Sequence, residues 1–125
     1  MPRASCDPSW IAMERLRAKG EFQEVFSTGR RLSNSVATFM ILPREGEGVY
    51  TAFSVGKRFG SAVRRNRLKR RLREACRLEL AGSTIAGGWS VVCIPRARAA
   101  EADFSTLRAA LRELLALAGV LDRSN

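Results

Sequence analysis

The most constraining feature of this 125-residue sequence is one segment that is both densely basic and amphipathic. Residues 57–77 contain ten lysines and arginines and a single acid, Glu74, and carry nine of the net charges in a total of +10. Apolar residues still recur in this segment at helical spacing, at Leu68, Leu72, Ala75 and Cys76. Such a stripe is typical of a surface helix that packs one side on a core. We therefore predict a helix over 61–80, with Ser61 as N-cap, an apolar inner side and a cationic outer side.

The rest of the chain predicts a small mixed fold around this helix. We expect helices over 20–29 and 104–118, strands over 35–42, 48–55 and 88–94, and a weaker strand over 30–33. The turn-like sequence Pro-Arg-Glu-Gly-Glu-Gly at 43–48 predicts that the strands on either side form an antiparallel hairpin. Asp103 is a suitable N-cap for the last helix, and Gly119 a suitable end. The order α-β-β-β-α-β-α predicts an α/β two-layer sandwich with three helices on a sheet of about four strands.

Residue types restrict the chemistry that the chain can perform by itself. Histidine is absent, which removes the commonest general base and any Ser-His-Asp triad. The three cysteines, Cys6, Cys76 and Cys93, are far apart, so neither a disulfide framework nor a zinc site is expected. We predict that Cys76 and Cys93 are small buried residues. No pair of carboxylates stands out, and we predict no catalytic residue and no metal ligand on this chain.

Length and hydropathy predict a single domain without a membrane partner. No stretch approaches the roughly 18 consecutive apolar residues of a membrane span, and the first residues lack the apolar run of a secretory signal. We expect a flexible tail over 1–13, a domain over 14–119, a short tail over 120–125, and a cytoplasmic location.

The basic helix is the strongest candidate for a binding site. Ion pairs along the helix cannot explain a cationic face that has one acid among ten basic residues. Arginine grips phosphates through a planar fork and stacks on bases, and Asn66 adds a directional contact. Lys57 and Arg58 precede the helix N-terminus, where phosphates bind readily. We therefore predict that the chain binds nucleic acid.

Two phenylalanines of the first helix allow two interpretations. Phe22, Val25 and Phe26 share one helix face, and this periodicity favours core positions for both rings. Alternatively, one ring is exposed and stacks on an unpaired base.

The central sequence is similar to that of a known family. The run F-S-V-G-K-R-F-G-S-A-V at 53–63, followed by R-N-R-x-K-R-x-x-R at 65–73, closely resembles the central motif of the bacterial ribonuclease P protein component family. The segment 15–29, with R-L-R and E-F-x-x-V-F-x-x-G, also resembles that family, and the likeness extends over about residues 14–118.

The resemblance implies a fold, a role and partners. The fold would be ribosomal-protein-S5-like, with a left-handed strand–helix–strand crossover, against the usual rule. The chain would be a monomeric protein subunit that binds the RNase P RNA and precursor tRNA and assists removal of the 5′ leader. The catalytic groups would belong to the RNA, with Mg²⁺ required by the holoenzyme and no cofactor bound by the protein alone.

The resemblance also implies which residues make these contacts. The residues that would contact the RNase P RNA are Arg65, Asn66, Arg67, Lys69, Arg70 and Arg73. The residues that would line or border a leader cleft, between the sheet and the first helix, are Phe22, Phe26, Lys57 and Arg58. Ala37 and Met40 stand where the family often has aromatic residues, so stacking from that strand is not expected.

Three other functional hypotheses compete with membership of this family. A helix-turn-helix DNA-binding protein needs a packed helix before the recognition helix, but here a strand and a glycine turn precede it. A membrane-surface helix would carry bulky aromatics on its apolar face, which this one lacks. Composition alone leaves open a ribosomal or general RNA-binding protein without a role in tRNA processing.

Overall fold

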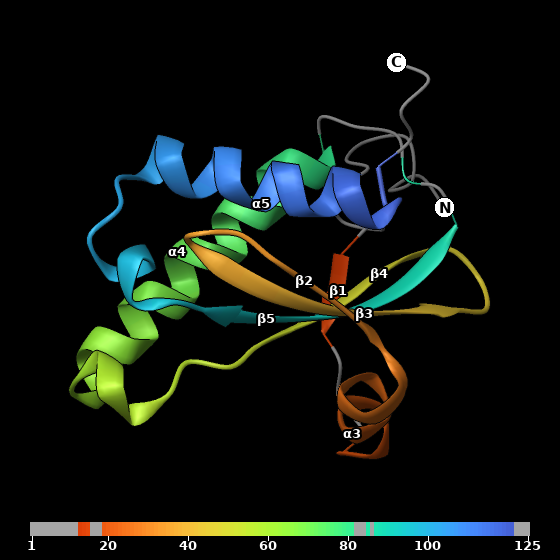
Figure 1. The fold of residues 1–125 in the computed structure, drawn as a ribbon, viewed down its shortest axis with the longest axis horizontal. Helices are drawn as coiled ribbons and strands as arrows, with labels where there is room; N and C mark the ends of the chain where they lie inside the picture. The colour runs from red at the N-terminus through yellow and green to blue at the C-terminus, as the bar shows by residue number, and fades with distance from the viewer. Residues whose placement is uncertain (1–12, 16–18, 82–84, 86, 122–125) are drawn as a thin grey trace, which may run out of the picture.

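A computed structural model describes residues 13–15, 19–81, 85 and 87–121 of the chain. In Figure 1 a twisted sheet forms the centre, with α4 and α5 on one face and α3 on the other. The α-helices of the described residues are α3 (Lys19–Thr28), α4 (Ala62–Ala81) and α5 (Phe104–Ala118). The strands are β1 (Met13–Arg15), β2 (Arg30–Ser33), β3 (Ala37–Arg44), β4 (Gly48–Phe53) and β5 (Gly88–Pro95), in the sheet order β1-β4-β5-β3-β2. Two short 3₁₀ helices, η1 (Lys57–Phe59) and η2 (Ala97–Ala100), precede α4 and α5.

The predicted α/β fold class is confirmed, but the predicted hairpin between β3 and β4 is wrong. Strand β5 lies between them, antiparallel to β3 and parallel to β4. Gly88, at the start of β5, shows how the connection crosses this strand. A Cβ atom there would lie 2.6 Å from the carbonyl oxygen of Arg44 and 2.7 Å from that of Gly46. The turn after β3 therefore passes directly over Gly88, and β4 pairs with the opposite edge of β5.

The sheet also has one strand more than expected. β1 pairs in parallel with β4, with Glu14 opposite Tyr50, and its three residues are too few to produce an alternating pattern in the sequence. The weakly signalled strand at 30–33 is present as β2, an edge strand antiparallel to β3. The parallel strands β4 and β5, joined through α4, form the strand–helix–strand unit that the resemblance implies. The hand of this crossover stays a prediction.

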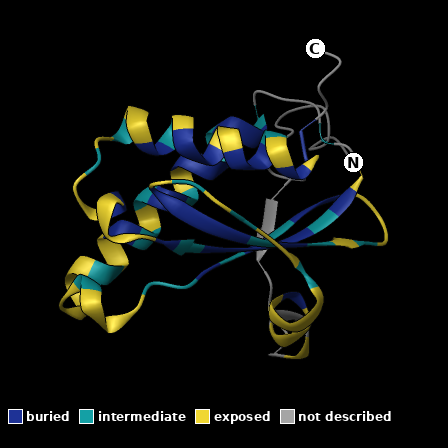
Figure 2. Ribbon diagram, in the orientation of Figure 1, coloured by how far each residue is buried: buried dark blue, intermediate teal, exposed yellow. Residues whose placement is uncertain are grey.

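The core lies between the sheet and the pair α4 and α5 (Figure 2). The predicted inner stripe of α4 is buried: Leu68, Leu72, Ala75 and Cys76. Phe39 of β3 and Leu111 of α5 are completely buried against it. The two helices are also joined by Glu79 of α4, whose carboxylate accepts a 2.6 Å hydrogen bond from Nε of Arg108. No helix among the described residues has the length and apolar character needed to cross a membrane.

The predicted helix ends are confirmed. Ser61 Oγ accepts a 3.3 Å hydrogen bond from the backbone N–H of Arg64. Asp103 Oδ1 accepts one of 2.9 Å from the N–H of Thr106, and contacts with Thr106 lower the pKa of the Asp103 carboxyl. Gly119 ends α5 in the left-handed conformation, with φ of 88°.

The opposite face of the sheet, which we call the open face, is partly covered by α3, the helix of the described residues that lies on this side. Residues that alternate with the core positions point to it, among them Met40, Ala52 and Val92, which lie in one row across β3, β4 and β5. Val92 is fully buried, and so is Val25 of α3, which contacts β3 and β5. Ala37 belongs to the core face, so only Met40 of the two departures from the family pattern concerns the open face.

We expect the thiols of Cys76 and Cys93 to resist alkylation in the folded protein. Both are buried, and burial raises the pKa of Cys76 to about 12 and that of Cys93 well above its ordinary value. Since the thiolate is the reactive form, a Cys6→Ser variant treated with iodoacetamide near pH 8 should remain unmodified by mass spectrometry. After unfolding in guanidinium chloride it should gain two adducts. Rapid labelling of the folded variant would show that this part of the core opens readily.

Candidate nucleic-acid interface

The basic helix begins at a sharp turn after β4. Lys57 and Arg58 lie in η1 and are exposed, and the guanidinium of Arg58 lies 5.1 Å from the centre of the Phe59 ring. Gly60 follows with φ of 109°, a conformation that glycine adopts without strain. The turn thus places two cations directly before the N-terminus of α4, as the sequence predicts.

Four of the six residues predicted to contact RNA come together on the outer side of α4. With Val63 they line a shallow hollow of about 440 Å³, and we call these four residues the outer α4 surface: Asn66, Lys69, Arg70 and Arg73. Asn66 and Arg70 are exposed, whereas Lys69 and Arg73 are half-buried. The guanidinium of Arg73 lies 5.7 Å from the centre of the Phe53 ring, which limits where this cation can move. The surface therefore presents three cations around one neutral, directional amide.

The acid nearest in sequence does not neutralise this surface. Arg77 donates hydrogen bonds to both carboxylate oxygens of Glu74 and lowers the pKa of the Glu74 carboxyl. The charge of Glu74 is thus matched by Arg77, one turn beyond Arg73, and the positive charge of Lys69 and Arg70 stays available to a polyanion.

Arg67 and Arg65 occupy different surroundings from the other predicted residues. Arg67 lines a second hollow, of about 280 Å³, together with Arg64, Arg71, Phe59 and Leu68. Arg71 is fixed there by a 2.9 Å hydrogen bond from Nη2 to the carbonyl oxygen of Ala102. Arg65 is half-buried, and its Nε is buried without a hydrogen-bond partner among the described residues. The predicted set is thus divided between two sides of the helix.

The residues predicted to border a leader cleft come from α3 and η1. Val25 is buried, but Phe26 is 40% exposed, so the prediction of a core position is wrong for Phe26. The side chain of Phe22 lies outside the described residues. In Figure 1, η1 lies at the left end of the molecule, and α3 lies below the sheet, right of its centre. Because the ring of Phe26 is exposed, it is accessible for stacking on an unpaired base, and this interpretation stays a prediction.

The open face between these elements is mixed in character. Ser33 and Thr38 share a hydrogen bond of 3.0 Å across β2 and β3. Tyr50 is covered by the guanidinium of Arg44, 3.8 Å from the ring centre, and Arg44 also donates to Ser90 at 3.2 Å. Met40 adds a half-buried apolar side chain. These described residues offer hydroxyl groups, a thioether and the guanidinium of Arg44 to a ligand.

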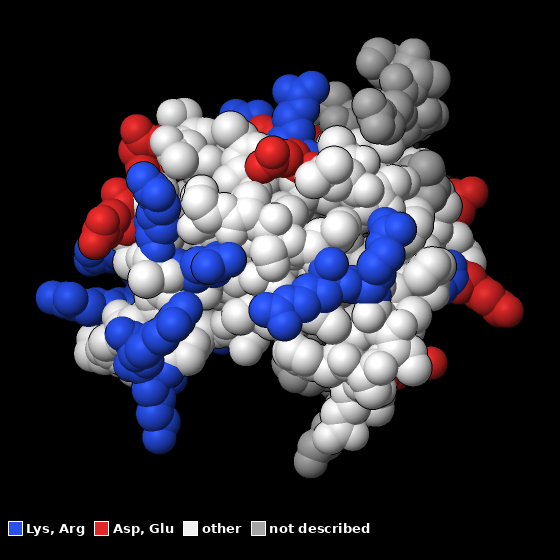
Figure 3. Space-filling model, in the orientation of Figure 1, with Lys and Arg blue, Asp and Glu red and all other residues white. Residues whose placement is uncertain are grey.

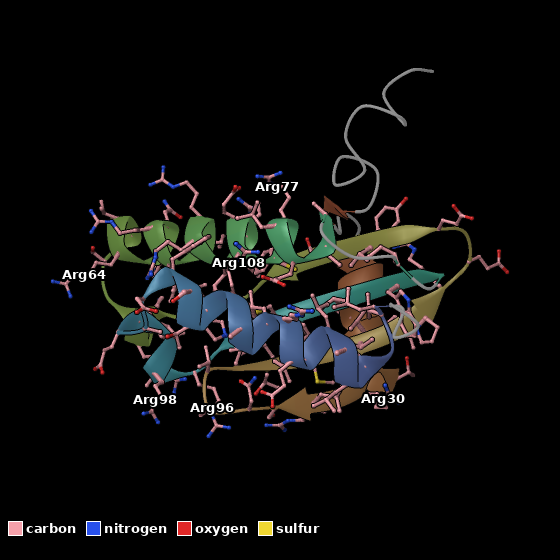
Figure 4. The ribbon with its side chains drawn as sticks, turned by 90° about the horizontal axis from the view of Figure 1, so that it is seen from above. Arg30, Arg64, Arg77, Arg96, Arg98 and Arg108 are labelled. Carbon is pink, nitrogen blue, oxygen red and sulfur yellow. The ribbon has the colours of Figure 1, made fainter. Side chains whose placement is uncertain are left out.

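Basic residues also gather outside the outer α4 surface. Figure 3 shows lysine and arginine side chains at the end of the molecule formed by η1 and the start of α4, and a further run across the face toward the viewer. In Figure 4, Arg77 of α4 points to one side of the molecule, and Arg30, Arg96 and Arg98 point to the other. The described residues contain no group of three His, Cys, Asp or Glu that could hold a metal ion.

Comparison with known proteins decides the family. The family model described as "Ribonuclease P" matches residues 12–119. The chain belongs to the ribonuclease P protein family. It is 38% identical over 110 residues to the ribonuclease P protein component of Symbiobacterium thermophilum, which covers 87% of this chain and 94% of that protein. It is 40% identical over 108 residues to the component from Chloroflexus aggregans, covering 86% and 78%.

Solved structures of ribonuclease P proteins agree with this assignment. The protein from Thermotoga maritima superposes with a TM-score of 0.72 at 35% identity, covering 82% of this chain and 94% of that one. The protein from Staphylococcus aureus superposes with a TM-score of 0.74 at 25% identity, covering 86% and 97%. The family resemblance of the central motif is therefore confirmed, and the reading as a ribosomal protein is set aside.

Proposed function

We propose that this chain, as the protein subunit of ribonuclease P, binds the RNase P RNA through the outer α4 surface and the 5′ leader of precursor tRNA through the open face of the sheet. The holoenzyme is an endoribonuclease that removes this leader. The observation that carries the proposal is the outer α4 surface itself, in which three cations and one amide surround a single hollow.

The chemistry of the outer α4 surface suits structured RNA. Phosphate contacts supply most of the affinity of such interfaces, and two arginines with one lysine match a folded RNA backbone. Asn66 lies among them, and its amide can both donate to and accept from a ribose or a base edge. The opposite side of α4 is buried in the core, which fixes the side of the helix that faces a partner.

The leader is proposed to cross the open face between η1 and α3. An unpaired RNA strand needs cations for its backbone and flat or apolar groups for its bases. Lys57 and Arg58 supply the cations at one end, and the exposed ring of Phe26 supplies a stacking surface at the other. The half-buried Met40 and the paired hydroxyls of Ser33 and Thr38 lie on the face between them. Every one of these contacts is independent of leader sequence.

The proposed division of labour leaves bond cleavage to the RNA. The chain has no histidine and no predicted pair of catalytic carboxylates. In the proposal, the RNA would hold the Mg²⁺ ions, which would activate the attacking water and offset charge on the leaving group, and this chain binds and orients both RNAs.

The protein alone is expected not to cleave precursor tRNA. RNA-free protein incubated with labelled precursor and Mg²⁺ should leave the leader attached, and addition of RNase P RNA should start specific release, read on a denaturing gel. Specific cleavage by the protein alone would disprove the division of labour. Failure to stimulate cleavage by the RNA would favour a general RNA-binding protein instead.

Asn66→Ala is expected to distinguish the contribution of hydrogen bonds by Asn66 from the electrostatic attraction of the surrounding cations. Loss of one or two hydrogen bonds should weaken binding of RNase P RNA roughly three- to tenfold. The slope of log affinity against log salt should stay unchanged, because no charge is lost. Filter binding over a series of KCl concentrations measures both quantities. An unchanged affinity would remove Asn66 from the interface.

A further inference from the structure

A second basic surface lies on the side of the molecule away from the outer α4 surface. We call it the β2-edge surface, and its members are the exposed residues Arg30, Arg31, Arg96 and Arg98. Two of them belong to the edge strand β2, one follows β5 and one lies in η2. Figure 4 shows the three labelled members, Arg30, Arg96 and Arg98, along the same side of the sheet. Folding thus gathers arginines that are up to 68 residues apart in the sequence.

The charge of the β2-edge surface is not neutralised within the chain. Among the described residues, no carboxylate forms an ion pair with any of the four arginines. Arg30 donates a 2.8 Å hydrogen bond to the carbonyl oxygen of Ala118, and Arg96 a 3.4 Å bond to that of Asn34. The nearby acid Glu113 accepts instead from the side-chain amide of Asn34. These contacts orient two of the guanidinium groups and leave most of their N–H donors to an external acceptor.

Ordinary structural roles explain only part of this surface. Arg30 satisfies a carbonyl in the last turn of α5, a common role for a cation at a helix C-terminus. Basic residues on an edge strand also discourage pairing with another chain, which accounts for Arg31. Neither role applies to Arg96 or Arg98, because both lie outside the strand and away from the end of α5. Their alignment with β2 therefore needs another explanation.

The β2-edge surface continues from the proposed leader site. Arg31 pairs in register with Met40, whose row on the open face continues through Val92 and Ala52. The helix α3 ends at Thr28 and β2 begins at Arg30, only four residues after the exposed Phe26. An RNA strand that crosses the open face and passes α3 must leave the sheet over its β2 edge. There it meets arginines, which favour phosphates.

We propose that the β2-edge surface binds the backbone of the upstream part of the 5′ leader, beyond the nucleotides held by the open face. The inference rests on the proposed leader site and extends it with a segment recognised through phosphates alone. Its affinity depends on leader length and salt, and it is independent of base sequence.

The test uses the reconstituted holoenzyme with precursor tRNAs of three leader lengths: one nucleotide, just long enough to cross the open face, and twice that length. The variant combines Arg31→Gln, Arg96→Gln and Arg98→Gln and keeps Arg30, which supports α5. It should weaken binding of the longest leader about tenfold and reduce its salt slope by about 2, as expected for three lost contacts with a single strand. The two shorter leaders should bind as they do to the unmodified holoenzyme.

A control variant removes one charge elsewhere on the surface. Arg112, with 68% of its side chain exposed, lies on α5 at 4.0 Å from Glu79, and Arg112→Gln should leave all three affinities unchanged. Thermal melting of each variant reveals any loss of folding through Arg96. Equal weakening for all leader lengths, or weaker binding of RNase P RNA, would overturn the inference and assign the surface to another RNA contact. Equal affinity of the unmodified holoenzyme for the middle and longest leaders would also overturn it. The proposed leader site would be disproved separately, by equal affinity of that holoenzyme for the two shorter leaders.

Discussion

Replacing Lys69, Arg70 and Arg73 together with glutamine is expected to weaken binding of RNase P RNA about a hundredfold or more near physiological salt. The three cations surround the same hollow, so one RNA segment can contact them all. If the helix and the turn before it neutralise about six phosphates, the log–log salt slope of the unmodified protein should be roughly −4, and that of the variant roughly −2. Filter binding across a KCl series gives both slopes.

The control for this experiment lies on the same helix. Arg77→Gln also removes one positive charge from α4, but Arg77 is engaged with Glu74, so its loss should change affinity far less than loss of Arg70. Glutamine keeps most of each side chain's length and polarity, and the altered residues lie outside the buried stripe of α4, so melting temperatures should stay close together. An unchanged salt slope in the triple variant would show that RNA binds somewhere other than the outer α4 surface.

The helices could be predicted from the sequence because their determinants are local. Ser61 and Asp103 each cap the helix that follows within three residues, and Gly119 ends α5 through its own backbone conformation. The inner stripe of α4 is likewise set by spacing within a single helix. Such features need no knowledge of the rest of the fold.

The strand order could not be predicted in the same way. A turn-like sequence between two strands favours a hairpin, and only the pairing of β5 with both strands shows that it separates them. Gly87 and Gly88 are the one local sign, because a side chain at Gly88 would collide with the turn between β3 and β4. β1 could not be predicted either, because its three residues are too few for a periodic pattern.

The candidate site was predicted where it is continuous in the sequence and missed where it is not. The outer α4 surface is a helix face, so its members follow from helical spacing. The β2-edge surface could not be predicted from charge along the sequence, because its arginines belong to segments that are joined only by the pairing of β2 with β3 and of β3 with β5. Arg67 was grouped with Arg70 by the motif, yet it lines a different hollow.

Substitutions in the proposed leader site are expected to depend on leader length, unlike those on α4. Phe26→Ala should weaken holoenzyme binding of precursors whose leaders cross the open face, by up to about a hundredfold, because a base stacked on an aromatic ring is worth roughly 1–3 kcal/mol. Lys57→Gln should weaken the same precursors and also reduce their salt slope by roughly 0.7, as for one lost phosphate contact. Precursors with a one-nucleotide leader should bind both variants almost normally.

Two comparisons make this result specific. Gln23 is exposed on the same helix as Phe26, so Gln23→Ala controls for a change in α3 itself, and melting curves control for folding. Arg70→Ala should impair holoenzyme assembly or raise its Mg²⁺ requirement equally for short and long leaders, because Arg70 lies on the surface proposed to contact the RNA subunit. If Phe26, Lys57 and Arg70 variants all lose affinity to the same degree at every leader length, the two surfaces do not have separate partners. The basic residues would then act as one electrostatic footprint, in which position on the fold matters less than total charge.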